Sequence, residues 1–373
     1  MRRYTATVLL ALLACIVMAI PAVRPADFLS RSERAQLSSL PLRSTDSGPL
    51  PTRPFRLVGV TWAKSAVPSP PLISVRTRTQ NIWTEWQTLT TETMDAPDPR
   101  AEESAGDDVR QGTQPLYAGL SDGVQVRVLP SQPELPTDLR IELIDPGLST
   151  ADVSVLPLQS AAATREEGAK PAIIPRARWG ADESIRRCCP KYGKIIKAAF
   201  VHHTASSTDY QPAESAAMVR AIYTYHVRSR GWDDIGYNFL VDRFGQIFEG
   251  RAGGMDKPVV GAHASGFNTD SFGVAALGTY EKTPPPKALL RGLQQVLTWK
   301  LGLNQSDPLG TASFLPVGAS PSTRPTQLPV IAGHRDAGRT LCPGAQLYQK
   351  LPALRAEVKA ALTPSTPTKP KPK

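Results

Sequence analysis

The first half of the chain alternates side-chain character over several short runs. Apolar or β-branched residues occupy every second position in residues 73–78, 124–128 and 139–143. Successive side chains of a β-strand point to opposite faces, so a period of two predicts half-buried antiparallel strands. Turn-forming residues separate these runs, which favours a small all-β, sandwich-like domain over residues 55–157. The acidic, proline-containing segment 90–112 within this domain predicts a long loop.

In the second half, some segments have apolar residues at helical spacing and others are short continuous apolar runs. This pattern predicts strands that alternate with helices. Residues 212–227 place Met218, Ile222 and Tyr225 on one face, as expected for an amphipathic helix. Short apolar runs on either side of such helices predict buried strands. This alternation indicates an α/β domain in which helices flank a central mixed β-sheet. The expected strands are residues 197–201, 237–241, 246–248, 273–277 and 328–331, and the expected helices are 212–227, 287–301 and 345–362.

The N-terminal end of the chain has the pattern of a targeting segment. Arg2 and Arg3 precede an apolar run over residues 6–20, which ends at a proline and a small residue. This arrangement is typical of a secretory signal peptide, which we expect over residues 1–26. We therefore expect a secreted, wall-associated protein. The apolar run is only slightly short for a membrane span, so an uncleaved anchor is the alternative.

Three further segments lack apolar periodicity. Residues 27–54 contain many Ser, Pro and Arg residues and predict a flexible lead-in to the first domain. Residues 158–172 are rich in Ala with mixed charge and predict a linker between the domains. Residues 363–373 consist mainly of Pro, Thr, Ser and Lys and predict a disordered tail.

Length, charge and cysteine content narrow the class of protein. A chain of 373 residues suggests two domains, and a net charge of +10 favours contact with polyanions such as cell-wall polymers. Nucleic acid is not indicated, because no basic stripe is interleaved with aromatic residues. Among the four cysteines, Cys188 and Cys189 are adjacent, and their state is left open.

Two histidines and one cysteine are candidate zinc ligands. His202 ends an apolar run, and His334 and Cys342 lie eight residues apart across a loop that contains Gly338. Neutral imidazoles and a thiolate are good ligands for Zn²⁺, and three protein ligands leave the fourth position open for water. A zinc site of this kind is catalytic, because the metal ion lowers the pKa of the water bound at the fourth position. His203 is a rival first ligand, but neighbouring strand residues point to opposite faces.

Several short motifs carry a resemblance to a known family over about half the chain. From about residue 174 to 362 the chain resembles the zinc amidase domain shared by peptidoglycan recognition proteins and bacteriophage-type lysozyme amidases. We therefore expect this domain over residues 173–362, and residues 55–157 resemble the β-rich region that precedes such domains in secreted actinobacterial proteins. The matching motifs are Pro175-Arg176-Ala177-Arg178-Trp179-Gly180-Ala181, His202-His203-Thr204, Tyr225-His226, Asp234-Ile235-Gly236-Tyr237-Asn238-Phe239, Gly261-Ala262-His263, Gly333-His334-Arg335-Asp336 and Thr340-Leu341-Cys342-Pro343-Gly344.

The resemblance implies an activity and a role for each site residue. The family cleaves the amide between N-acetylmuramic acid and the first L-alanine of the peptidoglycan stem, and it assigns Zn²⁺ to His202, His334 and Cys342. Tyr237 matches a tyrosine whose hydroxyl can orient the zinc-bound water or stabilise the developing oxyanion. Thr340 stands where some members carry Lys, which leaves the electrophilic role of this position open. The substrate-binding candidates are His203, Thr204, His226 and His263.

Two other classes of function compete with a secreted zinc N-acetylmuramoyl-L-alanine amidase. A non-catalytic peptidoglycan-binding protein on the same fold is the main alternative, but such relatives typically lack the cysteine that Cys342 supplies. A wall-associated adhesin is disfavoured by the complete ligand set and by Tyr237. Because all of these residues fall in the second domain, we expect residues 172–362 to fold alone and to cleave soluble muropeptide. We expect the protein to be a monomer.

Overall fold

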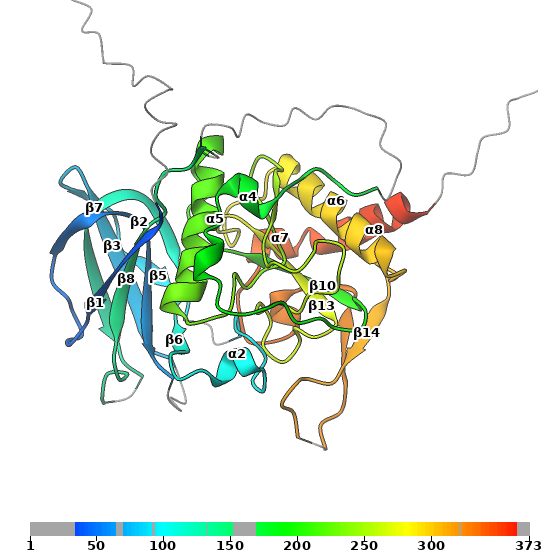
Figure 1. The fold of residues 1–373 in the computed structure, drawn as a ribbon, viewed down its shortest axis with the longest axis horizontal. Coiled ribbons are helices and arrows are strands. Elements are labelled where there is room, and N and C mark those ends of the chain that lie inside the picture. Colours follow the sequence, from blue (N-terminus) through cyan, green and yellow to red (C-terminus); the bar gives the residue numbers. More distant parts are fainter. Residues whose placement is uncertain are drawn as a thin grey trace, which may run out of the picture.

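The computed structural model describes residues 34–64, 70–91, 94–131, 133–150, 152, 169–320 and 322–363. The expected signal peptide, most of the expected linker and the expected Pro/Lys tail lie outside the described residues. Figure 1 shows two parts side by side, a β-rich first domain in blue to cyan and an α/β second domain in green to red. This is the arrangement of fold classes that the apolar patterning predicted.

The first domain is built on one antiparallel sheet with the strand order β1-β8-β2-β7-β3-β4. The alternation predicted for residues 73–78 is confirmed, because side chains of β3 alternate between buried and half-buried. Strands β2 and β7 each run for 14 residues and pair with each other through two register shifts. The strands are β1 (Gln36–Pro41), β2 (Leu50–Ala63), β3 (Leu72–Thr79), β4 (Ile82–Trp83), β5 (Gln87–Leu89), β6 (Arg110–Gly112), β7 (Leu116–Leu129) and β8 (Arg140–Asp145).

The expected flexible lead-in over residues 27–54 is wrong for much of its length. Strand β1 lies inside this range and pairs with β8 over six positions, and β2 begins at Leu50. An edge strand is held by backbone hydrogen bonds on one side only, so it needs few apolar side chains. Because the segment is mostly polar, its sequence did not predict this strand.

The acidic loop predicted over residues 90–112 leaves the first domain and crosses the second. It contains a short helix, α2 (Glu102–Ala105), and ends in β6, which pairs with β2. We call residues 94–106 the strap. In Figure 1 the strap and α2, in cyan, lie below the second domain and not over the first.

The second domain has a central mixed sheet with the strand order β16-β10-β13-β11-β12-β9. Strands β16, β10, β13 and β11 are parallel, and β12 is antiparallel to β11. Strand β9 pairs in parallel with β12 at the far edge. The strands are β9 (Ile173–Ile174), β10 (Ala198–His203), β11 (Phe239–Val241), β12 (Ile247–Glu249), β13 (Ser271–Ala276) and β16 (Ile331–Gly333).

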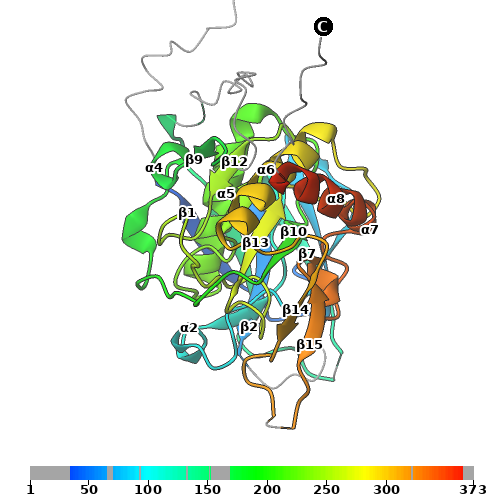
Figure 2. The same cartoon turned by 90° about the vertical axis from the view of Figure 1, so that its right-hand side faces the viewer.

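Helices cover both faces of this sheet. Figure 2 shows α6 and α8 together on one side, and their apolar residues share a core with Phe200 and Val274 of the sheet. A small hairpin extends from the same side. The helices and hairpin strands are α4 (Arg176–Trp179), η1 (Glu183–Ile185), η2 (Pro212–Glu214), α5 (Ser215–Thr224), a π-helical turn η3 (Tyr225–Ser229), α6 (Lys287–Leu303), β14 (Thr311–Phe314), β15 (Thr326–Pro329), η4 (His334–Asp336), α7 (Ala345–Tyr348) and α8 (Leu351–Leu362).

Helix α5 lies between the two domains. All ten of its residues are buried, although the sequence pattern predicted only one apolar face. One side packs on Leu240 and Ala275 of the second sheet, and the same core includes Leu57, Tyr117 and Ile144 of the first domain. The two domains therefore share a hydrophobic core, which weakens the expectation that residues 172–362 fold alone.

Candidate metal centre and active site

The sheet brings the first two predicted ligands together. Strands β10 and β16 are parallel neighbours, and Val201 is paired with Gly333 in their register. The residue after each member of this pair is a histidine, His202 in β10 and His334 at the start of η4. Parallel strands end at the same edge of a sheet, so the two imidazoles meet there. Cys342 reaches the same place from the loop that follows η4.

These three residues form a compact cluster of donor atoms. Their ligand atoms all lie within 4.8 Å of one another, and all three side chains are buried. The distance from His202 Nδ1 to Cys342 Sγ is 3.7 Å, and the rings of His202 and His334 have centroids 4.6 Å apart. His203, the rival first ligand, is not a member of this cluster.

The cluster fits a zinc ion. Zinc–nitrogen bonds of about 2.0–2.1 Å and zinc–sulfur bonds of about 2.3 Å put tetrahedral donors roughly 3.3–3.6 Å apart. The observed spacing between His202 Nδ1 and Cys342 Sγ is close to this value. Neither ring nitrogen of His334 has a hydrogen-bond partner in the described part of the chain, although both are buried. A bound cation would satisfy such a buried donor set.

Burial keeps the ligand imidazoles in the form that binds metal. Burial lowers the pKa of His202 to about 3. For His334, burial lowers the pKa to about 4 against an opposing effect of the Asp95 carboxylate. Both rings are therefore neutral at ordinary pH, and a neutral imidazole offers a lone pair to a metal ion.

A second layer of contacts orients the ligands. His202 Nε2 lies 3.1 Å from His263 Nδ1, so His202 can donate there while its Nδ1 faces the cluster. The Cys342 sulfur accepts a hydrogen bond of 3.4 Å from the His203 backbone N–H. The Cys342 backbone N–H donates to Thr340 Oγ1 at 2.8 Å. These contacts place His263 and Thr340, two predicted site residues, directly behind the ligands.

Tyr237 and His226 flank the cluster from a different side. The Tyr237 ring lies 5.3 Å from that of His202 and 5.7 Å from that of His226, measured between centroids. His226 Nδ1 accepts a hydrogen bond from the Gly236 N–H at 3.1 Å, and its ring stacks on Trp232 at 4.5 Å. The structure therefore places Tyr237 beside the ligand cluster and His226 beside Tyr237.

His203 and Thr204 accept hydrogen bonds from the segment that follows β13. His203 Nδ1 accepts a hydrogen bond of 3.4 Å from the Tyr280 N–H, and burial lowers the pKa of His203 to about 3. Thr204 Oγ1 accepts a hydrogen bond from the Gly278 N–H at 3.0 Å. Both side chains fix the turn after β13 in this conformation. Their predicted role in substrate binding stays a prediction.

Asp95 of the strap also contacts this cluster, although the sequence analysis did not single it out. Asp95 is 3% exposed. Its Oδ1 lies 3.5 Å from His202 Nδ1 and 3.4 Å from His334 Nδ1. Burial raises the pKa of the Asp95 carboxyl, whereas His334, Arg230 and Gln114 oppose that rise. A single aspartate in a loop has no periodicity or motif, so no pattern in the sequence could have indicated this contact.

No helix among the described residues has the length and apolar character needed to cross a membrane.

Two family profiles match the chain. The profile for N-acetylmuramoyl-L-alanine amidase matches residues 192–345. The profile described as Rv3811 N-terminal galactose-binding domain-like matches residues 32–166, which includes the strands β1 and β2 that the expected lead-in missed. The two matches correspond to the two domains of the structure.

Curated relatives match about half of the chain. Peptidoglycan recognition protein 1 of Bos taurus is 32% identical over 179 residues, which covers 48% of this chain and 81% of that protein. N-acetylmuramoyl-L-alanine amidase of Sus scrofa is 35% identical over 189 residues, but the match covers only 27% of that protein.

Solved structures of similar proteins also cover about half of the chain. Peptidoglycan recognition protein-LE in complex with tracheal cytotoxin is 29% identical, with a TM-score of 0.39, and the match covers 49% of this chain and 93% of that one. Human PGRP-IβC in complex with glycosamyl muramyl pentapeptide is 28% identical, with a TM-score of 0.37 and coverage of 48% and 93%.

Proposed function

The chain belongs to the family of peptidoglycan recognition proteins and N-acetylmuramoyl-L-alanine amidases, and from this premise we propose that it is a zinc-dependent N-acetylmuramoyl-L-alanine amidase. The observation that carries the proposal is the buried cluster of His202, His334 and Cys342, whose donor atoms lie within 4.8 Å of one another. The substrate is the amide between N-acetylmuramic acid and L-alanine in peptidoglycan. The two nitrogen atoms and the thiolate hold the metal ion.

Each residue of the centre has a distinct task in this reaction. When bound, zinc acts as a Lewis acid, which makes water a nucleophile at neutral pH and polarises a carbonyl. Tyr237, whose ring lies 5.3 Å from that of His202 between centroids, supplies a hydroxyl that stabilises negative charge as it develops on the substrate oxygen. His263 holds the His202 ring in position through the contact of 3.1 Å. Thr340 fixes the backbone of Cys342.

The main alternative is a protein of the same fold that binds peptidoglycan without cleaving it. A binding protein has no need for a thiolate beside two neutral imidazoles, because such a donor set serves a metal ion and not a sugar or peptide. Cys342 and Tyr237 therefore favour an enzyme. Metal content and product formation distinguish the two classes.

One experiment tests the proposal. We expect purified protein to contain one zinc ion per chain and to release the L-alanine amine from a soluble muropeptide, as followed by mass spectrometry. Cys342→Ser should lose both properties, because a hydroxyl is a much poorer zinc ligand than a thiolate. Cys188→Ser is the matched control, since Cys188 is exposed and outside the cluster. Muropeptide binding without zinc and without hydrolysis would favour the binding protein instead.

We propose in addition that the protein acts at the cell wall, outside the cytoplasmic membrane. This proposal rests on the signal-like pattern of residues 1–26 and on the net charge of +10, which favours anionic wall polymers. Fractionation of the producing cells tests it. Protein confined to the cytoplasmic fraction would exclude a role in the wall.

A further inference from the structure

The strap places a buried carboxylate beside the two histidines of the ligand cluster. Asp95 Oδ1 is 3.5 Å from His202 Nδ1 and 3.4 Å from His334 Nδ1, which matches the roughly 3.4 Å expected between tetrahedral zinc donors. Asp95 Oδ2 accepts a hydrogen bond from Gln114 Nε2. In the described part of the chain, Oδ1 has no hydrogen-bond partner although it is buried. One oxygen is therefore fixed by the protein and the other faces the ligand cluster.

We propose that Asp95 is the fourth ligand of the metal ion and that the strap holds most molecules of the enzyme in a closed, inactive state, so that the wild-type protein is slow but not inert. This inference rests on the proposed function, because it assumes zinc at His202, His334 and Cys342. Four protein ligands make a closed zinc site of the structural kind, with no position left for water or substrate. Activity then requires the Asp95 carboxylate to leave and a water molecule to take its place.

The strap is anchored by specific polar contacts on both sides of Asp95. The Ser265 N–H donates to Met94 O at 2.8 Å, and Asn268 Nδ2 donates to Ala96 O at 3.0 Å. Asp98, 4% exposed, accepts hydrogen bonds from the Gly266 N–H at 2.9 Å and from Asn268 Nδ2 at 2.8 Å. These contacts fix the backbone on both sides of Asp95 and therefore hold its carboxylate beside the ligand cluster.

A buried ion pair anchors the far end of the strap. Glu103 Oε1 and Oε2 accept hydrogen bonds from the two terminal nitrogens of Arg251 at 2.7 and 2.9 Å, and both side chains are less than a tenth exposed. Glu103 Oε1 also accepts from the Asp233 N–H at 2.9 Å. Paired and hydrogen-bonded charges of this kind are the form in which buried charges are tolerated.

The closed strap explains why the whole centre is buried. His202, Tyr237 and Cys342 are each 2% exposed or less, although a muropeptide must reach them. Met94 of the strap also packs on the loop between the ligands His334 and Cys342, where a side chain at Gly338 would lie 2.7 Å from Met94 Cε. Substrate therefore needs a conformation in which the strap has moved.

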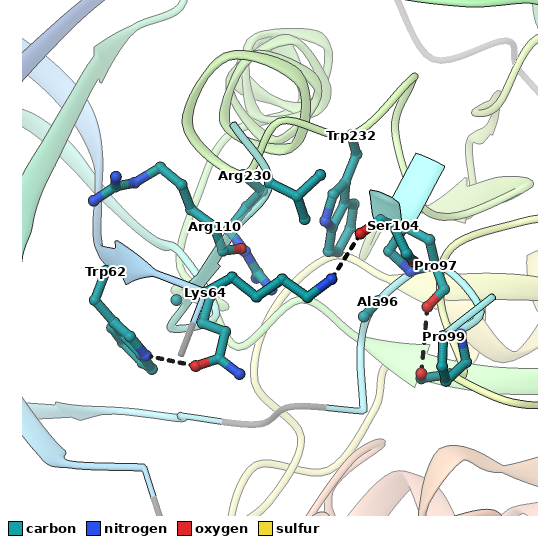
Figure 3. Close-up of a pocket in the computed structure, with 13 residues that line it drawn as sticks. Trp62, Lys64, Ala96, Pro97, Pro99, Ser104, Arg110, Arg230 and Trp232 are labelled. Atoms are coloured by element: carbon teal, nitrogen blue, oxygen red, sulfur yellow. Dashed lines mark hydrogen bonds between the residues drawn. The ribbon is translucent and has the colours of Figure 1, made fainter. Parts of the chain in front are cut away.

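The strap can move without opening the shared core of the two domains. A cavity of about 280 Å³ is lined by strap residues together with Trp62 and Lys64 of the first domain and Trp232 of the second. Figure 3 shows these side chains around it. Lys64 Nζ donates to Ser104 O at 2.7 Å across this space. Because the strap is held mostly by polar contacts, water can replace them when it leaves, whereas the apolar contacts of α5 need not change.

Cobalt substitution in the full-length protein tests the inference without relying on activity. With Co²⁺ in place of zinc, the wild-type visible spectrum should not respond to added azide, because no coordination position is open. Asp95→Ala should change this spectrum and make it sensitive to azide. The matched control is Asp107→Ala, an exposed carboxylate just beyond the strap, which should behave as wild type. A wild-type spectrum that azide shifts as much as that of Asp95→Ala would overturn the inference.

Hydrolysis of a soluble muropeptide is the second readout. We expect Asp95→Ala to raise the rate at least tenfold over wild type. Glu103→Gln, which weakens the anchor without touching the metal centre, should also raise it. Equal rates in wild type, Asp95→Ala and Glu103→Gln would overturn the inference and leave the proposed amidase intact. An azide-sensitive spectrum in Asp95→Ala with no hydrolysis by any variant would support Asp95 as a ligand and count against the amidase.

Discussion

The ring of Tyr225 fills the space where a side chain at Gly59 would stand. A Cβ built on Gly59 would lie 2.4 Å from Tyr225 Cε2, so only glycine permits this contact. The Tyr225 hydroxyl donates to Thr113 O at 2.8 Å. Tyr225 directly follows α5, whereas Gly59 and Thr113 belong to the first domain. The two domains are therefore held together by close packing and a hydrogen bond at Tyr225, and not only by the chain between them.

We expect Gly59→Ala to destabilise the full-length protein. The added methyl group must displace the Tyr225 ring, and overpacking of this kind costs about 1–3 kcal/mol of unfolding free energy. Gly310→Ala is the control, because the nearest atom to its Cβ would be 3.3 Å away and its neighbours can adjust. Urea unfolding of both variants measures the effect. Equal stability of Gly59→Ala and wild type would show that the contact is not tightly packed.

Tyr237→Phe tests the role of a single hydroxyl group. The ring and its contacts with His202 and His226 remain, so we expect zinc content to be unchanged. Turnover of muropeptide should fall by roughly 10²–10³, as for the loss of one oxyanion donor. The comparison is made with and without Asp95→Ala, so that slow strap opening does not mask the chemical step. An unchanged rate in both backgrounds would make Tyr237 a packing residue.

The sequence indicated the three residues of the buried cluster but not the strand pairing that brings them together. His202, His334 and Cys342 could be selected because their side-chain chemistry suits zinc and their motifs resemble a known family. The reason they meet is the parallel pairing of Val201 with Gly333, which is a long-range contact that local periodicity does not encode. The role of Asp95 was missed for the same reason, since its partners lie in the other domain.

Local patterns also failed where a surface is buried by a distant part of the chain. The apolar face of residues 212–227 was predicted, but the opposite face of α5 is buried as well, by the first domain. Arg220, on this helix, is 5% exposed and donates to Pro146 O and to Asp152 of the first domain. A charged residue in a helical pattern predicts a solvent-exposed face. The burial of Arg220 could therefore not be predicted without knowing its hydrogen-bond acceptors in the first domain.

Removal of the metal ion should destabilise the protein. Without a cation, Asp95 Oδ1 and both ring nitrogens of His334 remain buried with no hydrogen-bond partner in the described chain. A ligand at 100 times its Kd stabilises the native state by about 2.7 kcal/mol, so we expect a chelator to lower the Tm and added zinc to restore it. Cys342→Ser should show a much smaller response to the chelator. Identical Tm values with and without chelator in wild type would argue against a resident metal ion.

His226 should make the stability of the protein depend on pH. Burial, together with Arg230 and Arg251, holds the pKa of His226 well below its ordinary value of 6.5. The unfolded chain takes up a proton near pH 6.5 while the native state does not, so the stabilisation is full above that pH and is lost as the pH falls. His226→Asn keeps an acceptor for the Gly236 N–H but cannot titrate. We therefore measure the free energy of unfolding by urea, with chelator present, at pH 7, 6 and 5. Its slope against pH should be shallower in His226→Asn than in wild type by up to about 1.4 kcal/mol per pH unit. Parallel pH profiles for wild type and His226→Asn would contradict this assignment, whatever their difference in absolute stability.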